Sequence, residues 1–198
     1  MDINSSSPYN KHGHNQIKIC VSGSADLSNL SLDAQEKAKE LGREIARQGA
    51  VLVTGATTGF PFWAAMGAKE EGGISVGFSP AASEKEHVEI YKLPIDYMDL
   101  IVYTGFGYPG RDLLLTRSSD GVLFGPGRIG TIHEFTVAFE DAKPIGILEG
   151  PWETSEELKD IIKKGNRPND KIIFNDNNKK LVADVITMVK KYKIDDQK

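Results

Sequence analysis

Short apolar segments that alternate with amphipathic helical segments constrain the fold of this chain most strongly. The segments expected to be strands are residues 17–22, 51–54, 74–78, 100–104, 121–124, 144–148 and 171–174. The segments expected to be helices are residues 32–48, 60–71, 111–119, 131–142, 154–164 and 178–192. Continuous apolar strands that alternate with helices are typical of a parallel sheet that helices cover on both faces.

The connections between such segments set the topology. Right-handed crossovers between parallel strands build a doubly wound sheet. The sequence therefore predicts an α/β protein with a single-domain, doubly wound Rossmann-like fold and a mainly parallel sheet across residues 17–198. Residues 1–16 are polar and are expected to form a disordered tail, while residues 81–98 are expected to be irregular. Ser31 is the expected N-cap of the first helix, and Gly49 is its expected stop.

Composition excludes several classes of protein. The chain has 198 residues, a formal net charge of −4 and a single cysteine, Cys20, which is expected to be a small buried hydrophobe in the first strand. An acidic chain binds nucleic acid poorly, so no nucleic-acid partner is expected. No apolar run reaches the roughly 18 residues of a membrane helix, and the first residues lack the apolar core of a secretion signal. We therefore expect a cytoplasmic protein with no membrane partner.

Glycines gather where the expected strands end. They fall in the loops at residues 23–24, 55–59, 105–110 and 127–131. The carboxyl ends of parallel strands meet at one edge of the sheet, which is where doubly wound folds bind ligands. A tight turn explains any one of these loops, but four on one edge favour a phosphate-bearing ligand held by backbone N–H groups. The expected ligand-binding residues of the first two loops are Gly23, Ser24, Gly55 and Gly59.

The segment PGRIGTIHE combines a loop, a helix start and an acid. Its expected phosphate-binding residues are Gly127, Arg128, Gly130 and Thr131. Glu134 lies one helical turn after Thr131 on the same face. There its carboxylate can stabilise an oxocarbenium-like centre at C1′ of an attached ribose, or activate a water. A first-turn acid also stabilises the helix dipole, and spacing alone leaves both roles open.

Arg111 is the second candidate catalytic residue. Arg111 and Arg117 are six positions apart and cannot share one face of a helix, and Arg111 lies nearer the carboxyl edge of the sheet. A guanidinium suits a phosphate because it donates two parallel hydrogen bonds. The alternative is a surface salt bridge with Asp112 or Asp120.

These residues together resemble a known family. PGRIGTIHE is similar to the PGGxGTxxE motif of the Lonely Guy (LOG) family, whose members are often labelled lysine decarboxylases. Arg111 lies nine positions before Asp120, and Pro126 lies six positions after it, a spacing similar to that of the family's arginine, aspartate and loop. VSGS and VTGATTGF fit as well, so the resemblance covers roughly residues 17–150.

The resemblance implies a Rossmann-like fold, a homodimer or higher homo-oligomer, and a pocket for a nucleoside 5′-monophosphate. In characterised members it also implies hydrolysis of the N-glycosidic bond to free base and ribose 5-phosphate. By resemblance, Glu134 and Arg111 take the catalytic roles, and Gly127, Gly130 and Thr131 bind the 5′-phosphate. This chemistry requires no metal and no cofactor.

Two departures from the motif point to a different branch. Arg128 stands where the motif has its second glycine, and Asp112 stands where the family has a lysine after the arginine. With these departures the chain more closely resembles divergent relatives such as the molybdenum cofactor carrier proteins, in which the pocket binds a phosphorylated ligand without clear turnover. The alternative function is therefore a non-catalytic carrier or sensor of a nucleotide or phosphorylated cofactor. An NAD-dependent oxidoreductase is disfavoured, because no GxGxxG follows the first strand.

The remaining candidates have ordinary structural explanations. One of Phe60, Phe62 and Trp63 can stack on a purine, although short aromatic clusters more often belong to the core. His133 is expected beside the site rather than as its general base. His12 and His14 are two residues apart in the polar tail and make a poor metal site without cysteine or carboxylate support, so no metal is expected.

Overall fold

A computed structural model describes residues 16–26, 28, 32–167 and 169–195. The expected tail, apart from its last residue, and the expected N-cap Ser31 lie outside the described residues. The strands are β1 (Lys18–Ser22), β2 (Val51–Thr54), β3 (Ser75–Ser79), β4 (Leu100–Tyr103), β5 (Gly121–Phe124), β6 (Ile145–Leu148) and β7 (Ile172–Asn175). The helices are α1 (Leu32–Arg47), α2 (Phe60–Glu70), α3 (Glu84–Glu89), α4 (Gly107–Ser118), α5 (Ile129–Glu140), α6 (Thr154–Gly165) and α7 (Asn178–Asp195).

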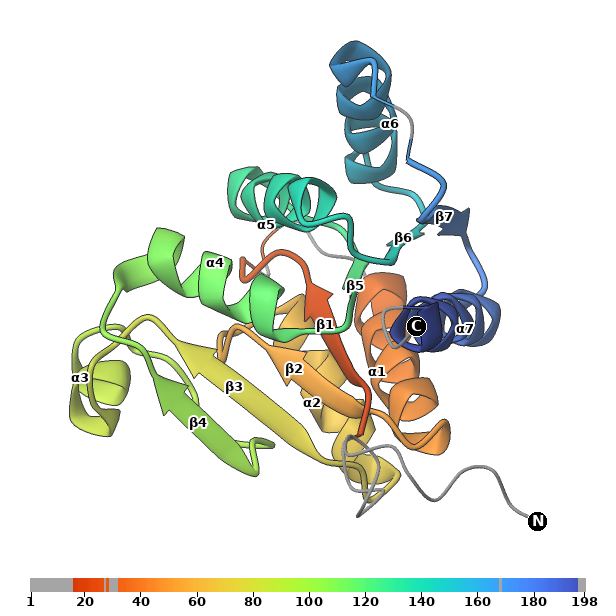
Figure 1. The fold of residues 1–198 in the computed structure, drawn as a ribbon. Helices are drawn as coiled ribbons and strands as arrows, with labels where there is room; N and C mark the ends of the chain where they lie inside the picture. The colour runs from red at the N-terminus through yellow and green to blue at the C-terminus, as the bar shows by residue number, and fades with distance from the viewer. Residues whose placement is uncertain (1–15, 27, 29–31, 168, 196–198) are drawn as a thin grey trace.

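The strands form one all-parallel sheet in the order β4-β3-β2-β1-β5-β6-β7 (Figure 1). The chain builds outward from β1 on one side, then returns and builds outward from β5 on the other. β1 and β5 are therefore neighbours whose following loops lead to opposite faces of the sheet. Their carboxyl ends are level, since Ser22 lies opposite Phe124. This reversal creates the crevice that doubly wound folds use for ligands, and the predicted fold class is confirmed.

Helices cover both faces of the sheet (Figure 1). α1, α2 and α7 bury one apolar cluster against it, and α4, α5 and α6 bury another. β1 serves both clusters, because successive side chains of a strand point to opposite faces. Ile19 and Val21 pack on the first side and Cys20 on the second, all without exposure to solvent. Full burial of one such aliphatic side chain contributes about 1.5–3 kcal/mol, which explains why the central strands read as unbroken apolar runs.

Three helix positions differ from the expectation. α4 begins at Gly107, within the segment predicted to be a glycine-rich loop. Pro109 fits its first turn, where no backbone N–H needs an intrahelical partner. α5 begins at Ile129, two residues before the predicted start. α3 lies inside the stretch predicted to be irregular, where Ser83 caps it by accepting a hydrogen bond from the Glu86 amide at 3.2 Å.

Candidate functional site

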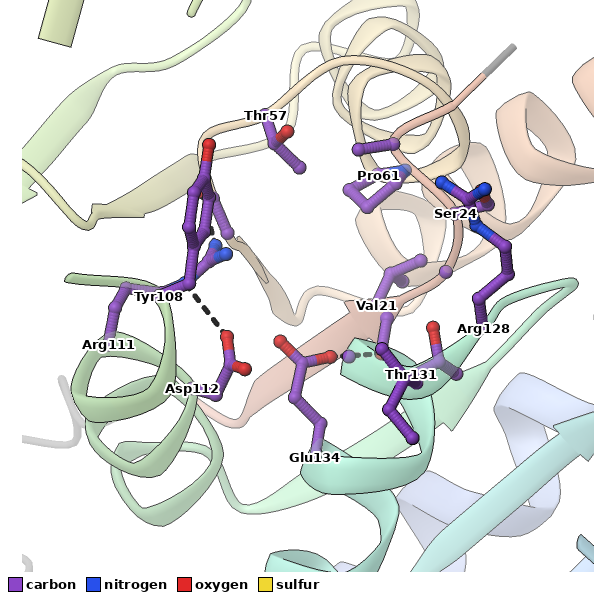
Figure 2. Close-up of a pocket in the computed structure, with 16 residues that line it drawn as sticks. Val21, Ser24, Thr57, Pro61, Tyr108, Arg111, Asp112, Arg128, Thr131 and Glu134 are labelled. Atoms are coloured by element: carbon purple, nitrogen blue, oxygen red, sulfur yellow. Dashed lines mark hydrogen bonds and ion pairs between the residues drawn. The ribbon is translucent and has the colours of Figure 1, made fainter. Parts of the chain in front are cut away.

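A cavity of about 580 Å³ opens at the carboxyl edge of the sheet, at the reversal between β1 and β5. The loops after β1 and β2 and the first turns of α4 and α5 form its walls (Figure 2). Its lining residues are Val21, Ser22, Gly23, Ser24, Ala25, Gly55, Thr57, Pro61, Tyr108, Arg111, Asp112, Arg128, Ile129, Gly130, Thr131 and Glu134.

The cavity brings most of the predicted site residues together from segments far apart in the sequence. Gly59 and Gly127 are not among the lining residues. Gly59 has φ of 73°, and a Cβ there would lie 2.2 Å from the Ser24 carbonyl oxygen, so this glycine lets the loop after β2 pack on the loop after β1. Gly127 leaves room for Thr131, whose hydroxyl oxygen would lie 2.0 Å from a Cβ at that position.

Arg111 is buried at the α4 end of the cavity. Its Nη1 donates hydrogen bonds to the carbonyl oxygens of Gly55 at 2.5 Å and Phe78 at 3.4 Å. Its Nε lies 3.0 Å from Asp112 Oδ1. A Cβ on Gly55 would lie only 1.7 Å from Arg111 Nη1, so the glycine makes room for the guanidinium. The neighbouring carbonyls and Asp112 thus hold Arg111 in place.

Glu134 is a buried acid on the floor of the cavity, with 7% of its surface exposed. Its Oε2 accepts a hydrogen bond from the Ser22 hydroxyl (Figure 2). Burial, followed by the negative charge of Asp112, raises the pKa of Glu134 to about 8, while Arg111 and Ser22 oppose the shift. The side chain is therefore mainly a neutral carboxylic acid at pH 7.

Asp112 lies between the buried interior of the site and a partly exposed histidine. Its Oδ1 contacts Arg111, and its Oδ2 lies 3.1 Å from Nδ1 of His133, which is 42% exposed. His133 therefore lies beside the site and touches it through Asp112. Sequence reasoning treated Asp112 as the loss of a positive charge and as a surface salt-bridge partner of Arg111. The ion pair is present but buried, and Ser22 was not considered. The signals available in the sequence were the position of Asp112 directly after Arg111 and that of Ser22 at the end of the first strand.

The opposite end of the cavity is the start of α5. Arg128 is the N-cap residue, and its side chain makes no capping hydrogen bond. The first-turn amides of Ile129, Gly130 and Thr131 have no partner one turn earlier in the helix, which leaves donors for an anion. Arg128 Nη1 lies 3.1 Å from Asp26 Oδ2, and its side chain is 66% exposed. Figure 2 places Arg128 across the cavity from Tyr108 and Arg111.

The aromatic side chain that lines the cavity is Tyr108, not a member of the predicted cluster. The Arg111 guanidinium lies over its ring, 5.6 Å from the centroid. Phe60 is fully buried in the core, Phe62 contacts Tyr97, and Trp63 packs partly buried against the core. The structural interpretation of that cluster is confirmed.

Other expectations concern metals, membranes and the cysteine. Among the described residues, no three His, Cys, Asp or Glu side chains form a group that can hold a metal ion. Within the same part of the chain, no helix combines the length and apolar character of a membrane span. Cys20 is buried as expected, and burial raises the pKa of its thiol.

Comparison with known proteins shows which family this chain belongs to. The family described as SLOG cluster4 matches residues 16–182. The chain belongs to the SLOG cluster4 family. An uncharacterized protein of Archaeoglobus fulgidus is 30% identical over 150 residues, which are 72% of this SLOG protein and 90% of its relative.

Solved structures of similar fold include cofactor-binding proteins. A molybdenum cofactor binding protein from Rippkaea orientalis is 25% identical with a TM-score of 0.71, covering 90% of this chain and 98% of its own. The molybdenum cofactor carrier protein of Chlamydomonas reinhardtii is 28% identical with a TM-score of 0.65, covering 89% and 98%. DNA processing protein A of Streptococcus pneumoniae shares the fold at 16% identity and a TM-score of 0.64, over 87% of this chain and 61% of its own. These comparisons establish the SLOG family and a likeness to molybdenum cofactor carriers; they do not establish membership of the LOG family.

Proposed function

We propose that this protein binds a phosphorylated small molecule, either a nucleotide or a phosphorylated cofactor, and holds it without chemical turnover. The observation that carries the proposal is a cavity with the start of α5 and Arg128 at one end and a buried Glu134, whose pKa is raised, on its floor. The likeness to molybdenum cofactor carrier proteins supports the same conclusion.

The phosphate belongs at the start of α5. Free first-turn amides and the positive end of the helix dipole favour an anion there. The exposed guanidinium of Arg128 adds a cation on the same wall, and Thr131 lines the cavity beside it. The predicted phosphate-binding roles of Gly130, Thr131 and Arg128 remain part of this proposal.

The protonation state of Glu134 argues against hydrolysis at neutral pH. Stabilisation of an oxocarbenium-like centre requires a carboxylate, and so does activation of a water as a base. With a pKa of about 8, Glu134 is ionised in only a minor fraction of molecules at pH 7, which weakens both roles there. An anionic phosphate nearby would raise that pKa further, because like charge disfavours ionisation. A neutral acid tolerates the ligand's charge and donates or accepts a hydrogen bond.

A second candidate function is nucleoside 5′-monophosphate phosphoribohydrolase activity. Arg111 and Glu134 line the same cavity, as the resemblance to the LOG family implied. Under this proposal Arg111 orients the ligand and Glu134 acts after losing its proton. Activity would then rise with pH as Glu134 ionises.

The test combines binding with product analysis. Purified protein is titrated with AMP and GMP by calorimetry, and the same mixtures are analysed for free base at pH 7 and pH 9. We expect thermal stabilisation, worth roughly 2.7 kcal/mol at a hundred-fold excess over Kd, without release of base. Glu134→Gln, which stays neutral, should bind about as well as the unmodified protein. Release of base that disappears in Glu134→Gln would reject the carrier function in favour of the hydrolase.

We also propose that the protein forms a homo-oligomer. Exposed large apolar side chains gather on one side of the molecule, along α3, β4 and α4 and the segments that join them. They are Val88, Ile90, Ile95, Tyr97, Leu100, Val102, Phe106, Tyr108, Leu113 and Leu114. Such a gathering is typical of an interaction surface. Light scattering coupled to size-exclusion chromatography tests it, and a monomer at micromolar concentration would contradict it.

A further inference from the structure

A second cavity of about 440 Å³ adjoins the first at the start of α5. Ser24, Arg128 and Ile129 line both cavities, so the two share a wall. The second lies between the loop after β5 and the first turn of α6. Any group bound at the start of α5 is therefore within reach of both spaces.

An exposed ion pair stands at the boundary between the cavities. Arg128 Nη1 lies 3.1 Å from Asp26 Oδ2, with 66% and 36% of the two side chains exposed. Exposed ion pairs contribute little to stability, because water solvates the separated charges well. A ligand phosphate can therefore replace Asp26 as the partner of Arg128.

The walls of the second cavity differ in chemistry from those of the first. Carboxylates of Asp26, Glu153 and Glu157 stand beside apolar surface. The apolar lining residues are Pro126, Ile129, Ile132, Pro151 and Trp152. Carboxylates repel a phosphate but accept hydrogen bonds from amino groups. A flat heterocycle with amino or ring N–H donors fits this combination, as nucleobases and pterins do.

Trp152 is held in a fixed position for such a contact. Its Nε1 donates a hydrogen bond to the Leu148 carbonyl oxygen at 3.1 Å, and Lys37 lies over its ring at 5.7 Å. Thr154 joins the second cavity to the phosphate loop, since its hydroxyl accepts from the Gly127 amide at 2.9 Å and contacts the Gly127 carbonyl at 3.0 Å. The start of α6 therefore keeps its position relative to the start of α5.

We propose that the two cavities form one cleft for a two-headed nucleotide, meaning a ligand such as a dinucleotide in which a phosphate or pyrophosphate joins two terminal groups, here called heads. A phosphate or pyrophosphate at Arg128 and the start of α5 joins one head in the first cavity to an amino-bearing heterocycle against Trp152 in the second. The inference rests on the proposed function, which places a phosphate at α5, and it adds the class of ligand. The first head lies near Tyr108 and Glu134, and the second near Glu153 and Glu157.

The experiment compares one-headed and two-headed ligands on the full chain. AMP and P1,P2-di(adenosine-5′) pyrophosphate are each titrated by calorimetry. We expect the dinucleotide to bind at least ten-fold more tightly than AMP. Glu157→Ala should reduce this advantage several-fold and leave the affinity for AMP unchanged, because Glu157 lines only the second of the two cavities.

Matched variants separate recognition from folding. Glu156→Ala removes a neighbouring, likewise exposed acid of α6 that does not line the cavity, and it should leave both affinities unchanged. Trp152→Leu, checked for an intact fold by its unfolding transition, should reduce dinucleotide affinity selectively. Equal affinity for the two ligands, or equal losses for both in Glu157→Ala, would overturn the inference while AMP binding still supported the proposed function. Failure of both ligands to bind would overturn the inference together with the nucleotide form of the proposed function.

Discussion

The two ends of the first cavity use the same kinds of side chain in opposite ways. At the α4 end the Arg111 side chain is 7% exposed and contacts Asp112 together with two main-chain carbonyls. At the α5 end the Arg128 side chain is 66% exposed and pairs with Asp26. The first arginine is thus part of the interior, and the second lies on a surface that a ligand can rearrange.

Burial decides what each charge contributes. A buried ion that loses its partner has no water to replace it, whereas an exposed ion is solvated at once. The α4 end is therefore expected to govern stability, and the α5 end to govern ligand affinity. Mutations and pH changes that act on only one end test this distinction.

The largest effect is expected from Arg111→Ala. The substitution leaves buried Asp112 without its nearest cation and removes the donor to the Gly55 and Phe78 carbonyls. We expect the free energy of unfolding to fall by about 3–5 kcal/mol, measured by urea denaturation at pH 7.

Arg128→Ala is the matched control at the other end. It should cost under about 1 kcal/mol of stability, because the Arg128–Asp26 pair is exposed. It should instead weaken binding of AMP. Equal stability losses in the two variants would contradict the distinction between the ends.

The second effect is a pH dependence that comes from Glu134. Its pKa is about 8 in the folded protein, against an ordinary value of 4.5. Between these values the folded state holds a proton that the unfolded state releases, so stability is greatest at the acid end of this range. It should fall by up to about 1.4 kcal/mol per pH unit as pH rises towards 8.

Urea denaturation across pH 5–9 measures this dependence. Glu134→Gln stays neutral at every pH and should flatten the curve. Parallel curves for the two proteins would show that Glu134 ionises normally. Affinity for AMP should also decrease above pH 8, since an ionised Glu134 repels the phosphate.

Much of this arrangement was predictable from sequence, for clear physical reasons. The central strands are buried on both faces, so their apolar runs marked β1, β2 and β5 within a residue or so. The strand ends then predicted where the cavity would open. The spacing of Thr131 and Glu134 predicted that they share one helical face, and both line the cavity.

Burial and partner identity could not be read from local pattern. Nothing in RDLLL shows that Asp112 is 6% exposed and close enough to Glu134 to raise its pKa, because that depends on how α4 meets α5. The glycines among residues 105–110 suggested a loop where the helix in fact begins. α3 was missed although Ser83 and Glu86 form a capping pattern, because the segment is short and polar.

A smaller effect is expected from Gly55→Ala. The added Cβ would lie 1.7 Å from Arg111 Nη1, so the guanidinium would have to shift. We expect a loss of about 1–3 kcal/mol, as for other overpacked sites. Gly130→Ala is the control from the α5 end, since a Cβ there meets nothing within 4 Å. Thermal unfolding compares them, and an equal loss in Gly130→Ala would show that space at Arg111 is not the cause.

The smallest effect is expected from His133→Ala, which tests how the α4 end is held from outside. His133 Nδ1 lies 3.1 Å from Asp112 Oδ2, but its ring is 42% exposed and Asp112 keeps Arg111. Water can replace a partially exposed donor, so we expect a loss of about 0.5–1 kcal/mol in urea denaturation. A loss as large as that of Arg111→Ala would mean that Asp112 depends equally on both partners. The buried part of the α4 end that governs stability would then include His133 and would not stop at the cavity wall.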